Sequence, residues 1–124
     1  MMKATHLCVL LAAITPVTQA MEPEASGATR LPDTLTDAER GDMVKAANAY
    51  GECLIAEASQ REGEADPRTI ADAAMGACND RLDALQSLLA GLRLDTGYAE
   101  AFRRQTRDRA ARRLLGLLMQ MKGQ

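Results

Sequence analysis

Two cysteines, Cys53 and Cys78, carry the most clearly defined chemistry in the sequence. The chain encodes three cysteines, but Cys8 lies in an N-terminal segment with the features of an export signal and would leave with it. An even number of cysteines in an exported chain is typical of a disulfide bond. A redox-active pair usually has C-x-x-C spacing and a lowered thiol pKa. The wide spacing here therefore favours a structural cross-link.

A run of arginines near the C-terminus is the second feature that suggests chemistry, because guanidinium groups bind carboxylates and phosphates. Its members are Arg103, Arg104, Arg107, Arg109, Arg112 and Arg113. Glu100 with Arg104 and Asp108 with Arg112 have the i to i+4 spacing of helical ion pairs. The candidates for partner binding are the other four, Arg103, Arg107, Arg109 and Arg113. At about 100° per residue the run surrounds most of a helix, so a solvated or internally paired face is favoured over an anionic-partner site.

Few residues in the sequence are suited to catalysis or to metal binding. The single histidine, His6, lies in the export segment, so no serine has a histidine base. A carboxylate pair for acid/base work would have to come from Glu52, Glu57, Asp72, Asp80 and Asp83, for which a solvated face is favoured. Thioether binding of copper would have to use Met43, Met75, Met119 and Met121, for which core packing or chain-end filling is favoured. We predict no catalytic residue, no metal site and no cofactor.

The first twenty residues resemble a cleavable export signal. Lys3 supplies a positive start, residues 7–14 (LCVLLAAI) an apolar core and Thr18-Gln19-Ala20 a small-residue cleavage site. Eight apolar residues are too few to span a bilayer, which needs about 20, and no other transmembrane segment is expected. We therefore predict a periplasmic or secreted protein that begins after cleavage near Ala20.

The remaining residues, 21–124, predict one small all-α domain. They include nineteen alanines and thirteen leucines, whereas Val44, Ile55 and Ile70 are the only β-branched apolar residues. Residues 21–35 contain two prolines and few apolar side chains, which predicts a flexible leader before a helical domain at 36–124.

Helix signals divide that domain into three helices, at about 36–61, 67–91 and 97–121. Thr36 and Glu39 form a capping box, and Asp66-Pro67 is a typical helix start. In the first helix, Val44 and Ile55 lie on a second apolar stripe beside the main one. Two stripes need two neighbouring helices, so we expect a small three-helix bundle.

The first two helices are expected to form an antiparallel hairpin that turns near residue 65. Cys53 lies about twelve residues before this turn and Cys78 about thirteen after it, so the two come out level. Cysteine Cα atoms about 5.5 Å apart place the helix axes about 10 Å apart, as in ordinary helix packing. The cross-link should contribute about 3 kcal/mol to stability.

The hairpin sequence resembles a group of small exported proteobacterial proteins that has no assigned activity. The residues that carry the resemblance are Tyr50-x-x-Cys53, a short acidic turn, Thr69-Ile70-Ala71 and Ala74-Met75-Gly76-Ala77-Cys78. The resemblance implies a disulfide-linked hairpin and an envelope location, and it implies no catalytic residue. In size, export and helical content alone, the chain is also similar to periplasmic immunity proteins.

Charge is distributed unevenly along the chain. Residues 21–100 carry 16 acidic and 7 basic side chains, a net −9, whereas residues 101–124 carry 7 basic and one acidic, a net +6. The leading hypothesis is a non-enzymatic envelope protein that binds an unknown protein partner, for example as an inhibitor or immunity protein. The alternatives are a binder of a membrane surface or anionic polymer through the basic third helix, and an enzyme with a carboxylate pair. Nucleic acid is not expected as a partner.

Overall fold

The computed structural model describes residues 29–61, 63 and 66–123. These residues form four α-helices: α1 (Asp37–Ser59), α2 (Pro67–Ala77), α3 (Asn79–Gly91) and α4 (Thr96–Lys122), preceded by a short 3-10 helix (Pro32–Thr34). The prediction of an all-α fold is confirmed. The expected export signal and residues 21–28 of the expected leader lie outside the described residues.

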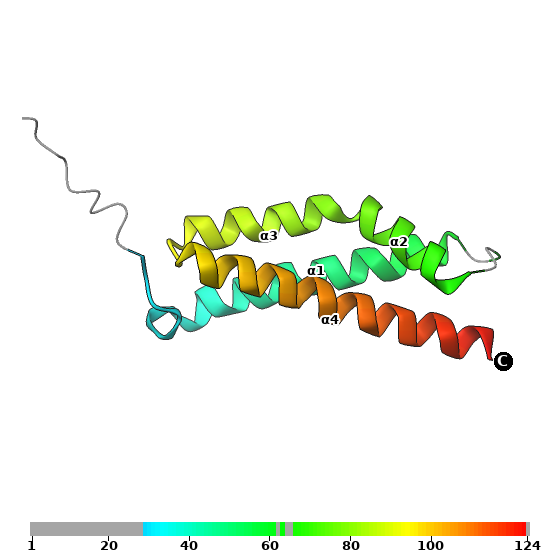
Figure 1. Ribbon diagram of the computed structural model, residues 1–124. Coiled ribbons are helices and arrows are strands. Elements are labelled where there is room, and N and C mark those ends of the chain that lie inside the picture. The colour runs from blue at the N-terminus through cyan, green and yellow to red at the C-terminus, as the bar shows by residue number, and fades with distance from the viewer. Residues whose placement is uncertain (1–28, 62, 64–65, 124) are drawn as a thin grey trace, which may run out of the picture.

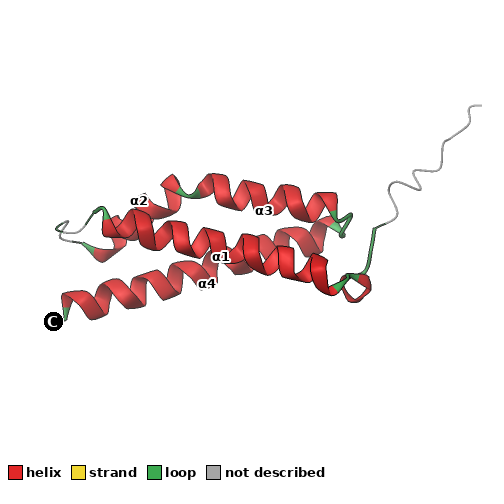
Figure 2. Ribbon diagram, turned by 180° about the vertical axis from the view of Figure 1, so that it is seen from behind, coloured by secondary structure: helices red, strands yellow, loops and turns green. Residues whose placement is uncertain are grey.

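The helices lie side by side along one long axis (Figures 1 and 2). The chain runs out along α1, returns along α2 and α3, and runs out again beside α1 as α4. α4 packs against each of the other three helices. The fold therefore has three passes but four helices rather than the expected three, because the second pass is made of two helices.

The break in the second pass corrects the prediction of one continuous helix over 67–91. Cys78 ends α2 and precedes α3 with φ −99° and ψ 8°, and the break is visible as a turn between the two helices in Figure 2. Weak helix formers surround it. Gly76 lies just before, and Asn79 and Asp80 follow directly, with side chains that compete for backbone hydrogen bonds. These local preferences give a physical reason for the break.

The predicted helix starts are confirmed at the level of hydrogen bonds. Glu39 N donates to Thr36 Oγ1 (3.1 Å) and Thr36 N donates to Glu39 Oε1 (3.0 Å), which completes the capping box. Arg68 N donates to the Asp66 carboxylate (3.0 Å) at the start of α2. These caps satisfy N–H groups that have no partner within the helix.

The ordered domain begins before Thr36, which corrects the description of 21–35 as flexible throughout. Arg30 N donates to the carbonyl of Arg93 in the α3–α4 turn (2.8 Å), and the Arg30 guanidinium pairs with Glu39 (2.6 Å). Leu35 is only 6% exposed and packs against leucines of α3. Residues 30–35 therefore form a strap that joins the start of α1 to the α3–α4 turn.

The core consists of two clusters along the bundle axis. The disulfide-end cluster comprises Tyr50, Leu54, Ala58, Ile70, Ala71, Ala74, Cys78, Leu82, Leu114 and Leu118. The strap-end cluster comprises Leu35, Met43, Leu85, Leu89, Leu94 and Ala99. Both contain side chains from α1, α3 and α4, so these three helices connect the two halves of the bundle.

Candidate functional site

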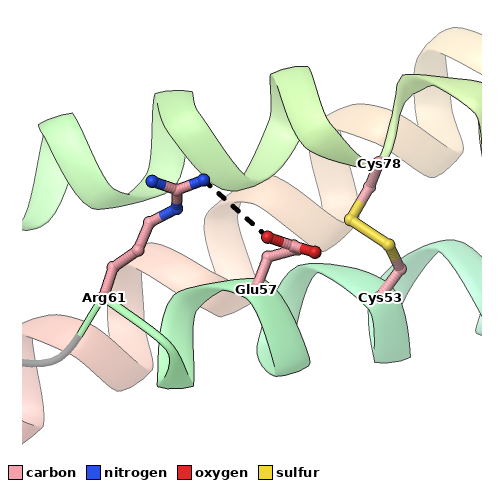
Figure 3. Close-up of a disulfide and its surroundings, with 4 residues drawn as sticks. All are labelled: Cys53, Glu57, Arg61 and Cys78. Atoms are coloured by element: carbon pink, nitrogen blue, oxygen red, sulfur yellow. Dashed lines mark ion pairs between the residues drawn. A yellow bond between two sulfur atoms is a disulfide. The ribbon is translucent and has the colours of Figure 1, made fainter.

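The disulfide joins the middle of α1 to the break between α2 and α3. Cys53 and Cys78 are bonded, with Cα atoms 5.9 Å apart, which confirms the predicted cross-link. Figure 3 shows the bond bridging the two passes, with Glu57 one turn further along α1. Glu57 pairs at 3.8 Å with Arg61, which lies just after the end of this helix. Because Cys78 is fully buried, the cross-link holds the break in place rather than lying on the surface.

Beside the break lies a hollow that we call the Tyr50 pocket. It has a volume of about 240 Å³ and lies between α1, the α2–α3 break and α4. Its lining residues are Tyr50, Met75, Gly76, Asn79, Leu82, Arg103 and Arg107. The pocket therefore brings together one phenol, one amide and two guanidinium groups that are distant in sequence.

Tyr50 is the most buried polar side chain of this pocket. The whole residue is inaccessible to solvent, and its hydroxyl has no hydrogen-bond partner among the described residues. Burial raises the pKa of the phenol, and the positive charges of Arg107 and Arg103 oppose that shift. Tyr50 lies in the same core cluster as Cys78.

A second hollow, the α1–α4 groove, lies where the two parallel helices meet at the surface. It has a volume of about 410 Å³. α1 lines it with Ala47, Asn48, Gly51, Glu52 and Ile55, and α4 with Thr106, Arg109, Ala110, Arg113 and Leu114. Small residues form much of both walls, and this leaves the groove open.

The structure divides the four candidate arginines between the two hollows. Arg103 and Arg107 line the Tyr50 pocket, whereas Arg109 and Arg113 line the α1–α4 groove. Arg103 also donates to Asp83 of α3 (3.0 Å). The four candidates therefore form two pairs of guanidinium groups on two sides of α4.

The expected neutralisation within α4 is not found. Neither Glu100 with Arg104 nor Asp108 with Arg112 is among the ion pairs of the described residues. Both arginines are exposed, and exposed side chains gain little from holding one paired geometry. Arg104 and Arg112 line neither hollow, so they are matched controls for the four that do.

The second apolar stripe of α1 has no helix covering it, which corrects the prediction that it faces a neighbour. Val44 is 56% exposed and Ile55 is 40% exposed. On α4, Leu117 is 39% exposed and Met121 is 57% exposed. Of these apolar side chains, Ile55 lines the α1–α4 groove.

Other chemistry is sparse in the part of the chain that the structure describes. No three His, Cys, Asp or Glu side chains there are placed to hold a metal ion, and no helix is long and apolar enough to cross a membrane. Of the candidate carboxylates, Glu57 pairs with Arg61 and Asp83 with Arg103. Glu52, Asp72 and Asp80 are exposed.

The sequence alone did not lead us to predict that Asn79, Leu82 and Gly51 line the two hollows. Two features of the sequence nevertheless indicate these positions. Weak helix formers at 76, 79 and 80 indicate a break, and a break opens space between passes. The second stripe of α1 contains Gly51 between Val44 and Ile55, which is typical of a helix that receives another helix closely.

Comparison of the chain with protein-family models, with curated proteins and with solved structures finds no match in any of the three. The resemblance to small exported proteobacterial proteins therefore stays a prediction.

Proposed function

We propose that this is an exported, non-enzymatic interaction protein that binds an acidic amphipathic helix of a partner protein in the α1–α4 groove. One observation carries the proposal: the groove combines uncovered apolar side chains with two guanidinium groups that have no ion-pair partner among the described residues. Helix-in-groove binding uses this combination of apolar anchors and flanking charge.

The apolar part of the groove has the periodicity of a helix-binding surface. On α1, Ala47, Gly51 and Ile55 line the groove at steps of four residues. This face extends over about 12 Å, or about two helical turns, at about 1.5 Å per residue. Ala47 and Ala110 on the two walls are small, so a partner helix can approach closely.

The charged part of the groove specifies the sign of the partner. Arg109 and Arg113 are one turn apart on the α4 wall, and Glu52 is the single acid on the α1 wall. Guanidinium groups bind carboxylates in a bidentate manner. The matching segment therefore presents apolar residues at three- and four-residue steps and two carboxylates one turn apart.

Export is part of the same proposal. The disulfide supports it because such bonds persist in oxidising compartments, and the first twenty residues have the order of a signal. Mass spectrometry of protein secreted by its host tests this directly. We expect a chain that begins near Met21 and lacks two hydrogens for the disulfide. A retained N-terminus or two free thiols would contradict export.

Site-specific crosslinking tests the groove. A photoreactive amino acid replaces Thr106 in the groove or, as control, the exposed Ala84 of α3, which lines neither hollow. After irradiation in a periplasmic extract, we expect an adduct from position 106 only. The attached peptide, sequenced by mass spectrometry, should be an amphipathic helix with two carboxylates one turn apart. A peptide without these carboxylates, or the same adduct from position 84, would refute the proposal.

Two matched pairs of variants then separate groove binding from general charge attraction. Gly51→Leu places a side chain in the groove, and Gly41→Leu makes the same change in α1 outside it; a Cβ meets no atom within 4 Å at either position. Arg109→Glu with Arg113→Glu reverses the groove charge, and Arg104→Glu with Arg112→Glu reverses the same charge elsewhere. We expect the adduct to be lost only in the groove variants. Equal loss of the adduct in both charge-reversed double variants, together with salt-sensitive binding to phosphatidylglycerol vesicles, would instead favour a protein that binds a membrane surface.

A further inference from the structure

The two walls of the α1–α4 groove carry opposite charge. Glu52 is the charged side chain of the α1 wall, and Arg109 and Arg113 are those of the α4 wall. All three are exposed, and none of them is in an ion pair among the described residues. The whole helices differ in the same sense. α1 carries five acidic and two basic side chains, a net −3, whereas α4 carries two acidic and seven basic, a net +5.

The opposite charges lie at the same level along the groove. α1 and α4 run in the same direction (Figure 1), and they line the groove over 47–55 and 106–114, two stretches of equal length. The middle residues of these stretches, Gly51 and Ala110, therefore come out level, because helical rise is regular. Glu52 lies one residue beyond this level, between the levels of Arg109 and Arg113.

Two twofold arrangements can bring the grooves of two copies face to face. With the axis along the helices, α1 of each copy faces α4 of the other, so that the net −3 helix meets the net +5 helix twice. With the axis across the helices, α1 faces α1 and α4 faces α4, so that like charges meet. Like charges opposed across an interface are unfavourable, and this selects the first arrangement.

We propose that the α1–α4 groove is the interface of a homodimer in which two copies pack in parallel, α1 of each against α4 of the other. Glu52 of each copy lies between Arg109 and Arg113 of the other. Guanidinium groups on both sides of one carboxylate can each donate to one of its oxygens, and the twofold axis repeats this contact.

The apolar lining of the groove fits the same arrangement. Ile55 is 40% exposed on the α1 wall, and it lines the groove together with Leu114 of the α4 wall. Gly51 and Ala110 at the centre are small, so the helices of the two copies can approach closely. The groove is only about 12 Å long at 1.5 Å per residue, so we expect a small interface and a weak, reversible dimer.

Self-association has a regulatory consequence, because the dimer covers the surface that we propose for the partner helix. The two modes of binding exclude each other, so an acidic partner helix must displace the second copy. This consequence rests on the proposed function, whereas the dimer does not. Purified protein tests the dimer without any partner. The periplasmic crosslinking experiment, done far below the dissociation constant of the dimer, tests the partner without the dimer.

Sedimentation equilibrium of the purified, disulfide-bonded protein over a wide range of concentrations tests the interface. We expect a monomer–dimer equilibrium that is weakened by added sodium chloride, because salt screens the exposed charges. Glu52→Arg, and separately Arg109→Glu with Arg113→Glu, should each raise the dimer dissociation constant at least tenfold. All three changes in one chain should restore it to within threefold, because the two walls then exchange their charges and attract again.

A matched control separates this pairing from the general charge of α4. Arg104→Glu with Arg112→Glu makes the same charge change at two exposed positions outside the groove, and it should leave the dissociation constant within threefold. Circular dichroism confirms the folding of each variant, and the concentration and salt series need no variant.

Three outcomes would overturn the proposal. Monomeric protein at every concentration would refute the dimer and leave the partner helix in place. A dimer weakened equally by the control variant, or unaffected by Glu52→Arg, would show that it does not form through this groove. Failure of the chain with all three changes to dimerise again, although it is folded, would refute the pairing of α1 with α4 of the other copy.

Discussion

Reduction of the Cys53–Cys78 bond should remove a large part of the stability of the bundle. The two cysteines are 25 residues apart, and the chain-entropy relation for closing a loop of this length gives about 3.5 kcal/mol at 25 °C. A domain of this size has a total free energy of unfolding of about 5 to 15 kcal/mol. The reduced protein should therefore retain its fold with a much smaller margin.

Urea denaturation followed by circular dichroism at 222 nm measures this difference on one chain, with and without reductant. We expect the free energy of unfolding to fall by about 3.5 kcal/mol and the melting temperature by about 14 to 28 °C, at about 4 to 8 °C per kcal/mol. The double variant Cys53→Ala with Cys78→Ala is the control, because reductant cannot act on it. Its curve should be the same under both conditions.

A difference below about 1 kcal/mol between oxidised and reduced protein would refute this reasoning. It would mean that the unfolded chain already keeps the two cysteines close, so that the bond removes little additional freedom. Hydrogen exchange locates the effect. On reduction, protection should fall most in α2, because this helix has only eleven residues and the bond fixes its end.

Three further perturbations test other parts of the fold. Leu35→Ala should lower the free energy of unfolding by about 2 to 4 kcal/mol, because Leu35 is buried in the strap-end cluster, whereas Leu31→Ala at a 66% exposed position should change it by less than about 0.5 kcal/mol in the same urea assay. Gly51→Ala should raise it by about 1 kcal/mol, since the added Cβ meets no atom within 4 Å inside helix α1. The pKa of Glu39 is lowered to about 2 from 4.5, chiefly by its hydrogen bond from Arg30; the stability from this pair is therefore fully present above about pH 4.5 and is lost as the pH falls toward 2. A Glu39→Gln variant should lack this part of the acid sensitivity, and an identical pH dependence of the urea midpoint in both proteins would contradict the role of the pair.

Local chemistry made much of the fold predictable. Thr36 with Glu39, and Asp66 with Pro67, specify helix starts through hydrogen bonds to residues two or three positions away, which a sequence displays directly. The Cys53–Cys78 pair was predictable because helical rise is regular, so that residues equidistant from a turn come out level.

The sites were less predictable because they depend on how the helices are rotated about their axes. Arg103 and Arg109 are six residues apart, about 240° around α4 at 100° per residue, but only packing decides which hollow each one lines. Tertiary contacts also decide that Leu35 is buried and Ile55 exposed. The pattern alone predicted the reverse, because it placed Leu35 in a flexible leader and Ile55 on a stripe that faces a neighbouring helix.

The division of the core into two clusters gives the molecule two ends that respond to different conditions. The disulfide-end cluster is held by a covalent bond, so the redox state of its surroundings controls it. The strap-end cluster is held by Leu35 and by the contacts of Arg30 with Glu39 and the α3–α4 turn, and of these the Arg30–Glu39 pair weakens as the pH falls from about 4.5 toward 2. Reduction and strong acid therefore act first on opposite ends of the same bundle. The Tyr50 pocket lies at the disulfide end of the bundle, and the Arg30–Glu39 pair lies at the strap end.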